Sequence, residues 1–231
     1  MTITLDHKPE TKNIDSYQGG RPDIIRFIDR ARFVLDVGCN VGAVARALKE
    51  KFPDCQVWGI EINQNALKQA EPMLEAGFCL NLDDCDSLRQ AVSTLRFDTI
   101  IAGDVLEHTA DPWRIVEILF STLLPGGSIF VSVPNIGHWE LIRHWLRQSW
   151  PVNPRGIFDN THRRFFMRSD LAKLAPRGSQ FILLSRTFRL FDKAHPRVDR
   201  LVSVLFRHIV WLREYFVFQY IFAIRWPGGT R

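Results

Sequence analysis

Apolar positions between residues 31 and 135 follow a repeating order, in which a short apolar run precedes a longer stretch with apolar residues at helical spacing. The short runs are RFVLDVG (32–38), CQVWGIEI (55–62), FCLNL (78–82), FDTIIAGDV (97–105) and SIFVSVP (128–134). Short runs of this kind predict strands that are buried on both faces. Helices are expected between them, at residues 42–52, 63–77, 87–95 and 111–124. In the helix at 63–77, Asn63 or Asn65 is the expected N-terminal cap and Gly77 the expected stop.

Strands that alternate with helices of this length predict β-α-β units, and therefore an α/β fold with a mostly parallel sheet and helices on both faces. The alternation ends after Pro134, and residues 136–176 predict an insertion of helix and loop. Two further strands are expected at 180–191 and 216–226, paired as an antiparallel hairpin, with a helix at 197–215 between them. The predicted sheet then has seven strands, of which the last is antiparallel.

The composition is that of a globular protein, with 46% apolar residues, but the charge is divided unevenly along the chain. Residues 1–135 carry 13 Lys and Arg against 19 Asp and Glu, a net charge of −6, whereas residues 136–231 carry 17 against 6, a net charge of +11. The basic part is either a solvated surface or a surface for an anionic partner. Because we recognise no signal peptide, no apolar run of 18 residues and no C-x-x-C pair, we expect a cytoplasmic protein with reduced thiols.

The loop LDVGCNVG (35–42), after the first strand, has the glycine-rich character of a nucleotide-binding turn. A dinucleotide fingerprint would require glycine where Asn40 and Ala43 stand, and the carboxylate of Asp36 would repel a pyrophosphate. The same carboxylate favours a cationic ligand such as S-adenosylmethionine. Gly38 and Gly42 permit close approach of the backbone, and asparagine is the residue after glycine that best tolerates positive φ.

Acidic residues follow the next three predicted strands as well. Glu61, with Ile62 beside it, ends the second strand, where a carboxylate can accept hydrogen bonds from both ribose hydroxyls. Either Asp83 or Asp84 follows the third strand, in a position to receive the adenine amino group. Asp104, with Val105 beside it, ends the fourth. Because the carboxyl ends of parallel strands meet at one edge of the sheet, these acids predict a single nucleoside site.

The chain resembles the class I S-adenosylmethionine-dependent methyltransferases through the stretches FVLDVGCNVGAVARAL, GIEIN, FDTIIAGDVLEHTADPW and LLPGGSIFVSVPN, which cover residues 33–135. The resemblance implies a Rossmann-like fold in a single domain, with an N-terminal arm and helix (1–30), a cofactor-binding core (31–135), a substrate-facing insertion (136–176) and the rest of the sheet (177–231). It also implies that Tyr17 and Arg21, in the segment before the first strand, approach the methionine end of the cofactor, and that Cys39 belongs to the cofactor loop.

Residues 134–167, which include PNIGHWELIRHWL and GIFDNTHRRFF, are similar to a group of methyltransferases associated with polysaccharide biosynthesis. This resemblance implies O-methylation of a sugar or of an anionic sugar conjugate. The DVLEH segment is shared with quinone-biosynthesis O-methyltransferases and with MetW-like proteins. A quinone or phenol methyltransferase at the membrane surface, for which the aromatic segment 214–224 would be suitable, and a MetW-like accessory protein are therefore the alternatives.

Methyl transfer to a hydroxyl requires a group that removes the acceptor proton. We expect His162 to be this base, with Asp159 as its orienting partner and His138 as a further catalytic candidate; a structural Asp159–His162 pair is the alternative. A divalent metal held by Asp104, Glu107 and His108 is a rival mechanism that we do not expect.

The insertion supplies the residues expected to bind the acceptor. These are His108 on the facing loop, and Trp139, Arg143, Arg163 and Arg164 within the insertion. Arginine suits phosphate or carboxylate groups, so an anionic small-molecule or glycan acceptor is predicted. A nucleic-acid partner is not expected, because no RNA-binding module and no motif for a flipped base is recognisable in the sequence.

Overall fold

The computed structural model describes residues 19–191 and 193–228, so the arm residue Tyr17 lies outside the described residues. Seven strands within these ranges form one sheet in the order β3-β2-β1-β4-β5-β7-β6. The strands are β1 (Phe33–Val37), β2 (Gln56–Glu61), β3 (Ala76–Cys79), β4 (Phe97–Gly103), β5 (Leu123–Pro134), β6 (Gln180–Phe188) and β7 (Val217–Arg225). The first five pair in parallel, and β7 runs antiparallel to both β5 and β6. The predicted α/β class and seven-stranded, Rossmann-like sheet are confirmed.

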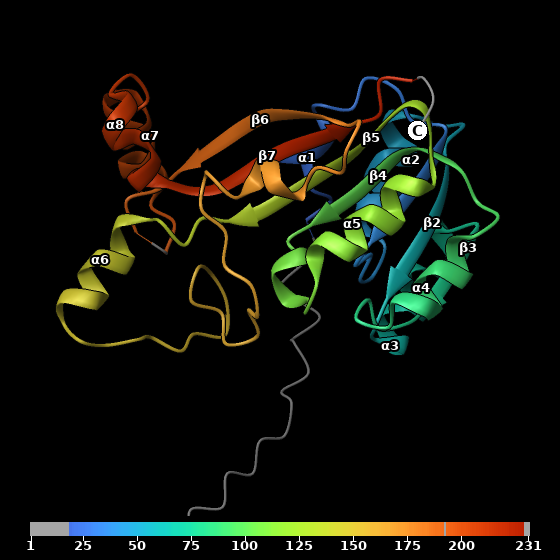
Figure 1. Cartoon of the computed structure of the whole chain (residues 1–231), viewed down its shortest axis with the longest axis horizontal. Helices are drawn as coiled ribbons and strands as arrows, with labels where there is room; N and C mark the ends of the chain where they lie inside the picture. The colour runs from blue at the N-terminus through green and yellow to red at the C-terminus, as the bar shows by residue number, and fades with distance from the viewer. Residues whose placement is uncertain (1–18, 192, 229–231) are drawn as a thin grey trace, which may run out of the picture.

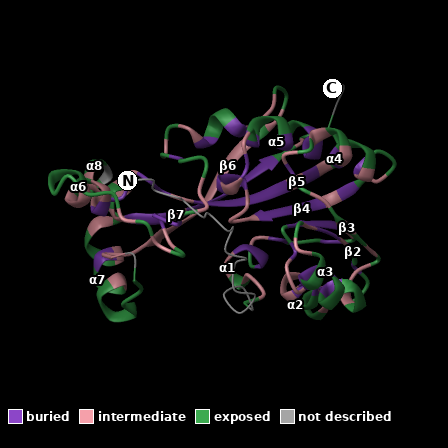
Figure 2. Ribbon diagram, turned by 90° about the horizontal axis from the view of Figure 1, so that it is seen from below, coloured by how far each residue is buried: buried purple, intermediate pink, exposed green. Residues whose placement is uncertain are grey.

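Helices cover both faces of the sheet (Figure 1). The helices are α1 (Pro22–Ile25), α2 (Ala43–Lys51), α3 (Gln64–Ala70), α4 (Cys85–Val92), α5 (Pro112–Ser121), α6 (Trp139–Leu146), α7 (Pro196–Phe206) and α8 (Val210–Arg213). In Figure 2, α4 and α5 lie on one face and α1, α2 and α3 on the other. Two apolar clusters separate the layers, one containing Leu88 and Ile115 and the other containing Ile24 and Leu48. No helix in the described part of the chain is both long and apolar enough to cross a membrane.

Several boundaries differ from those expected. Asn63 caps α3 as predicted, because its side chain accepts from the amides of residues 65 and 66, but the helix ends at Ala70. A single turn of 3-10 helix (Glu71–Met73) follows, and Gly77 lies within β3 rather than stopping a helix. The helix expected at 197–215 is divided into α7, α8 and a 3-10 turn (Glu214–Phe216). The predicted hairpin is confirmed, since β6 pairs with β7 from Gln180–Arg225 to Phe188–Val217.

Candidate active site

The loop between β1 and α2 is a tight turn with three residues at positive φ. The φ angles are 74° at Gly38, 78° at Gly42 and 46° at Asn40. The amides of Gly38 and Cys39 both donate to the carbonyl of Ile60, at 2.8 and 3.0 Å, which fastens the loop to β2. A Cβ at Gly38 would lie 3.0 Å from the side chain of Val105. Glycine at this position therefore serves both the backbone conformation and the close contact with the loop after β4.

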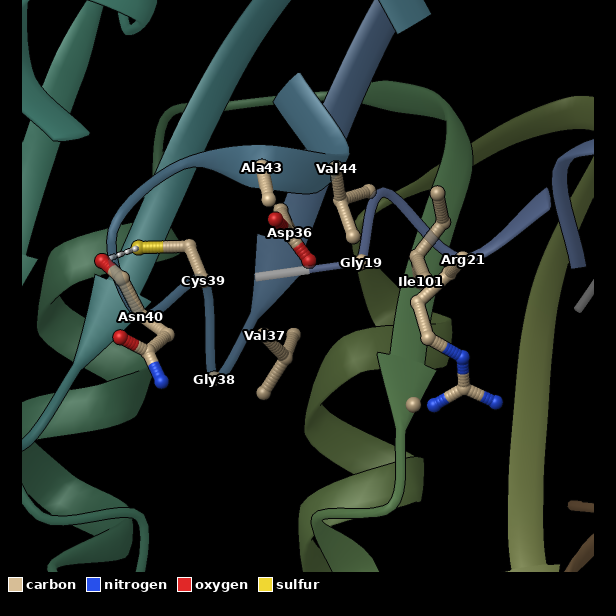
Figure 3. A pocket seen from close by; sticks show the side chains of 11 residues that line it. Gly19, Arg21, Asp36, Val37, Gly38, Cys39, Asn40, Ala43, Val44 and Ile101 are labelled. Carbon is tan, nitrogen blue, oxygen red and sulfur yellow. Dashed lines mark hydrogen bonds between the residues drawn. The ribbon is translucent and has the colours of Figure 1, made fainter. Parts of the chain in front are cut away.

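Asp36 lies at the bottom of a pocket lined by this loop, and its side chain is shown with the other lining residues in Figure 3. The residue is only 2% exposed, and its Oδ2 atom has no hydrogen-bond partner among the described residues. The Oδ1 atom of Asn40, which lines the same pocket, is buried and unpaired in the same way. Burial raises the pKa of Asp36 to about 7, and the charge of Glu61 adds to the shift. Two buried oxygen atoms thus remain available to a ligand with hydrogen-bond donors or positive charge.

Glu61 is fixed at the end of β2 by the backbone. One carboxylate oxygen accepts from the amide of Asn40 at 3.0 Å, and the other accepts from the amide of Asn63 at 2.9 Å. Each oxygen keeps further acceptor capacity, because an ionised carboxylate has about four lone-pair sites. The neighbouring Ile62 is a large apolar side chain that is exposed to solvent. Acceptor oxygens beside an exposed apolar side chain can bind a ribose next to a base.

The two acids after β3 have separate contacts. Asp84 caps α4 by accepting from the amide and hydroxyl of Ser87, and these hydrogen bonds lower the pKa of Asp84. Asp83 accepts from the amide of Ala110 at 2.7 Å and forms an ion pair with Arg163. Asp83 therefore joins the loop after β3 to the insertion, whereas Asp84 stabilises a helix.

Arg21, which lines the pocket, forms an ion pair with Asp104, with 2.9 Å between Nη1 and Oδ2. The other carboxylate oxygen of Asp104 accepts from Ser132 and Gln219, each at 2.6 Å. Arg21 also contacts Asp23 at 2.9 Å. The cluster joins the α1 segment to the ends of β4, β5 and β7, and Asp104 has a strained φ of 55°. The expected approach of both residues to the cofactor stays a prediction; Arg21 lines the pocket.

The insertion returns to the sheet and is held against the loop after β4. The amides of Arg163 and Arg164 both donate to the carbonyl of Glu107, at 2.8 and 2.9 Å. The guanidinium of Arg164 donates to the carbonyl of Ala110 at 2.7 Å. The segment DNTHRR therefore lies directly against the DVLEH segment.

Glu107, His108 and His162 come together where these two segments meet. Their potential ligand atoms all lie within 4.8 Å of one another. The two imidazole centroids are 4.8 Å apart, and Nε2 of His162 lies 4.0 Å from Oε1 of Glu107. The side chains of Glu107 and His162 are almost fully buried. We call these three residues the acid–histidine cluster. It differs at one position from the set considered for the rival metal mechanism, because it contains His162 where that set has Asp104.

Hydrogen bonds define the orientation of both histidines. Nδ1 of His162 lies 3.1 Å from the carbonyl of Ile157, and a carbonyl can only accept, so Nδ1 carries the hydrogen. The hydroxyl of Thr161 donates to Asp159 at 2.6 Å and lies 3.0 Å from Nδ1 of His108, from which it accepts. In the neutral rings, Nε2 is therefore the basic nitrogen of both. Asp159 acts on His108 through Thr161, a residue that sequence reasoning missed, because no motif distinguishes this threonine.

His138, Trp139 and Arg143 lie at the start of α6 instead. The fully buried ring of His138 accepts from the amide of Glu140 and contacts the carbonyl of Arg189 at 3.0 Å, so both ring nitrogens are engaged. The indole of Trp139 donates to the carbonyl of Leu190. Arg143 forms an ion pair with the buried Glu140 at 2.8 Å. These contacts hold α6 to the end of β6, and we do not retain His138 as a catalytic candidate.

Comparison with known proteins decides which family has this combination of fold and site. A sequence model described as a methyltransferase domain matches residues 15–183, which is more than half of the chain. The chain belongs to this methyltransferase family. The match includes both the pocket around Asp36 and the acid–histidine cluster, and the family expected from the sequence motifs is confirmed.

Curated relatives of this methyltransferase are named as ubiquinone biosynthesis O-methyltransferases. The protein from Idiomarina loihiensis is 32% identical over 153 residues, which cover 61% of this chain and 58% of the relative. The protein from Chromobacterium violaceum is 29% identical over 159 residues, which cover 64% and 66% of the two chains. The chain therefore spans about three fifths of the length of these relatives.

Solved structures share the fold of this methyltransferase. A SAM-dependent methyltransferase from Archaeoglobus fulgidus superposes with a TM-score of 0.59 at 16% identity, over 92% of this chain and 94% of the other. The plantazolicin methyltransferase BamL, solved in complex with SAH, superposes with a TM-score of 0.56 at 17% identity, over 88% and 80%.

Proposed function

We propose that this methyltransferase transfers the methyl group of S-adenosylmethionine to a hydroxyl group of a small-molecule acceptor. The observation that carries the proposal is the position of two sites at the ends of neighbouring strands. A pocket with the buried, unpaired carboxylate oxygen of Asp36 lies at the end of β1, and the acid–histidine cluster follows the end of β4. One site suits a cationic nucleoside, and the other suits removal of a proton.

The residues of the pocket fit S-adenosylmethionine on three grounds. The unpaired oxygens of Asp36 and Asn40 can accept from its amino group and attract its positive charge. The turn that contains Gly38 lines the pocket, so a ligand can lie against its backbone. Glu61 has acceptor capacity for ribose hydroxyls. When bound, the cofactor supplies an electrophilic methyl group. Isothermal calorimetry of Asp36→Ala and Glu61→Ala tests this assignment: we expect severe loss of affinity in both variants, and unchanged affinity in both would rule it out.

For the proton transfer we propose Nε2 of His162 as the base. Its Nδ1 hydrogen is held by the carbonyl of Ile157, so the lone pair lies on Nε2, and Glu107 at 4.0 Å stabilises the imidazolium that forms. His108, whose orientation is fixed through Thr161, is proposed to bind the acceptor beside it. The chain thus provides a base, a counter-charge and a positioning group within one cluster.

The test of the base compares histidine variants. We expect His162→Ala to lower turnover at least about a hundredfold, the usual contribution of a general base, while the dissociation constant of the cofactor is unchanged. His208→Ala, at an exposed position on the surface, is the matched control. Near-normal turnover of His162→Ala would remove it as the base. Loss of turnover on chelation, with recovery on adding a divalent cation, would instead favour a metal held by the same cluster.

For the acceptor, we propose a phenolic hydroxyl ahead of a sugar hydroxyl. The curated relatives are named for ubiquinone biosynthesis, and a phenol loses its proton far more readily than a sugar. The arginines expected to bind an anionic sugar all have protein partners: Glu140 for Arg143, Asp83 for Arg163 and the carbonyl of Ala110 for Arg164. A sugar conjugate remains the second candidate, supported by the similarity of residues 134–167. Product identification after incubation with labelled cofactor and either a catechol or a nucleotide sugar separates the two.

A further inference from the structure

Helix α6 exposes its apolar side chains and buries its acid. Ile142, Trp145 and Leu146 lie three and four residues apart, on one side of the helix, and all are exposed; Trp145 is 74% exposed. Glu140, on the same helix, is buried in its ion pair with Arg143. The apolar surface continues beyond the helix through the exposed Trp150 and Val152. This is the reverse of a helix that packs its apolar side on the core.

Helices α7 and α8 have the same reversed arrangement. Val198, Leu201, Val204 and Leu205 are exposed along α7, with the spacing of one helical face. Trp211 on α8 is 74% exposed. The ring of Phe206, at the end of α7, stacks at 4.0 Å on the ring of Phe216, which directly precedes β7. This contact fixes the helix that carries the exposed apolar face to the sheet.

Both elements project from the same end of the molecule. Figure 1 shows α6, α7 and α8 beyond the ends of β5, β6 and β7, away from the edge strand β3. Figure 2 shows the same separation from a second direction, with much of α7 exposed. The start of α6 contacts the segment that precedes α7, because Trp139 donates to the carbonyl of Leu190 and its ring lies 5.8 Å from that of Phe191. We call residues 139–152 and 193–213 the apolar–basic end.

The charge of the apolar–basic end is strongly positive. It contains seven Lys and Arg residues against two acids, a net charge of +5. Both acids are engaged: Glu140 in its buried ion pair, and Asp199 as acceptor from the amides of Leu190 and His195. Arg143 is paired with Glu140, and Arg213 with Glu214, which lies one residue beyond the defined range. The outward surface therefore combines tryptophan and aliphatic side chains with a net positive charge.

We propose that the apolar–basic end docks on an anionic lipid surface. Tryptophan favours the boundary between headgroups and acyl chains, apolar helix faces enter that boundary, and each Lys or Arg near an anionic surface adds about 1 kcal/mol of attraction. A second copy of the chain fits less well. A twofold dimer would bring two identical faces of charge +5 together, and like charges repel. The proposal is independent of the acceptor assigned above.

Sedimentation of the full chain with vesicles tests the docking. We expect binding to phosphatidylcholine vesicles that contain phosphatidylglycerol, little binding to phosphatidylcholine alone, and release by salt. The double variant Trp145→Ala/Trp211→Ala, which changes two side chains largely in solvent, is expected to bind at least about tenfold more weakly. Trp113→Ala, an exposed tryptophan on α5, is the matched control for the loss of indole.

Two further variants test the contribution of positive charge. Arg197→Gln/Arg200→Gln is expected to lower vesicle affinity, whereas Arg89→Gln on α4, at the other end of the molecule, is not. Absence of vesicle binding, or equal binding by the native chain and the double tryptophan variant, would overturn the proposal. So would a concentration-dependent dimer that the tryptophan substitutions abolish while vesicle binding is absent, because the occupant would then be a second copy.

Discussion

At the scale of the residue, the burial of Asp36 predicts a pH-dependent cost to stability. Burial, with the charge of Glu61, raises its pKa to about 7 in the folded chain, compared with about 3.9 in an unfolded chain. The folded state therefore binds more protons between these values, and stability falls as pH rises through this window. We expect Asp36→Asn to have a melting temperature several degrees above that of the native chain near pH 8.

The difference should shrink as the pH falls towards about 4, because Asp36 becomes largely protonated in both the folded and the unfolded chain only below its unfolded pKa of about 3.9. Differential scanning fluorimetry across this range, without cofactor, measures it. Glu117→Gln, which replaces an exposed carboxylate on α5, is the control and should leave the profile unaltered. A constant difference between Asp36→Asn and the native chain at every pH would mean that the carboxylate keeps its ordinary pKa.

The backbone of Asn40 gives a second prediction at this scale. Its φ of 46° is in the left-handed region, and its amide donates to Glu61. Asn40→Gly keeps both features, whereas a β-branched residue is strained there. We expect Asn40→Val to lose about 1–2 kcal/mol of unfolding free energy relative to Asn40→Gly. Urea denaturation of the two variants provides the comparison, and equal midpoints would show that the turn adopts another conformation.

At the scale of the element, the insertion acts on the site through Thr161. Its hydroxyl links Asp159 to Nδ1 of His108, a hydrogen bond that Thr161→Val removes without changing the shape of the side chain. If His108 binds the acceptor, the KM for the acceptor should rise roughly fivefold to tenfold, with a smaller change in kcat. A factor of this size corresponds to the free energy of about one hydrogen bond.

Steady-state kinetics with Thr161→Ser as the matched variant isolates the hydroxyl, because serine restores the donor and acceptor. Rescue of KM by serine is the expected outcome, with the cofactor dissociation constant equal in all three proteins. A loss that serine does not rescue, or a loss of cofactor binding, would indicate that residue 161 only holds the loop together.

Elements buried on both faces were the most predictable from sequence. β1, β2 and β4 are continuous apolar runs, and their acids could be assigned to one edge of the sheet. The edge strand β3 begins two residues and ends three residues before the range expected from sequence, because Gly77 also has the character of a helix stop. The contacts that build the site join distant residues, such as Arg21 with Asp104 and His108 with Thr161. No local pattern specifies such contacts, because they depend on how the insertion and arm return to the sheet.

At the scale of the whole molecule, the uneven charge of the sequence has a spatial counterpart. The strands β1 to β4 occupy one side, and the apolar–basic end occupies the opposite side (Figure 1). The acid–histidine cluster lies where the insertion returns between them. A nucleoside and a lipid surface would thus bind at separate places on one rigid sheet, and each should protect its own segments from hydrogen exchange.

Hydrogen–deuterium exchange with each ligand tests this separation. S-adenosylhomocysteine should slow exchange in residues 36–44, 61–63 and 104–108, because it restrains the loops that line the pocket. Phosphatidylglycerol vesicles should slow exchange in α6, α7 and α8 and leave those loops unchanged. With both ligands present the two patterns should add, since their sites share no contacts. Protection of the loops around Asp36 by vesicles alone would show that the lipid surface and the cofactor pocket are not separate, and would move the docking face to the other end of the sheet.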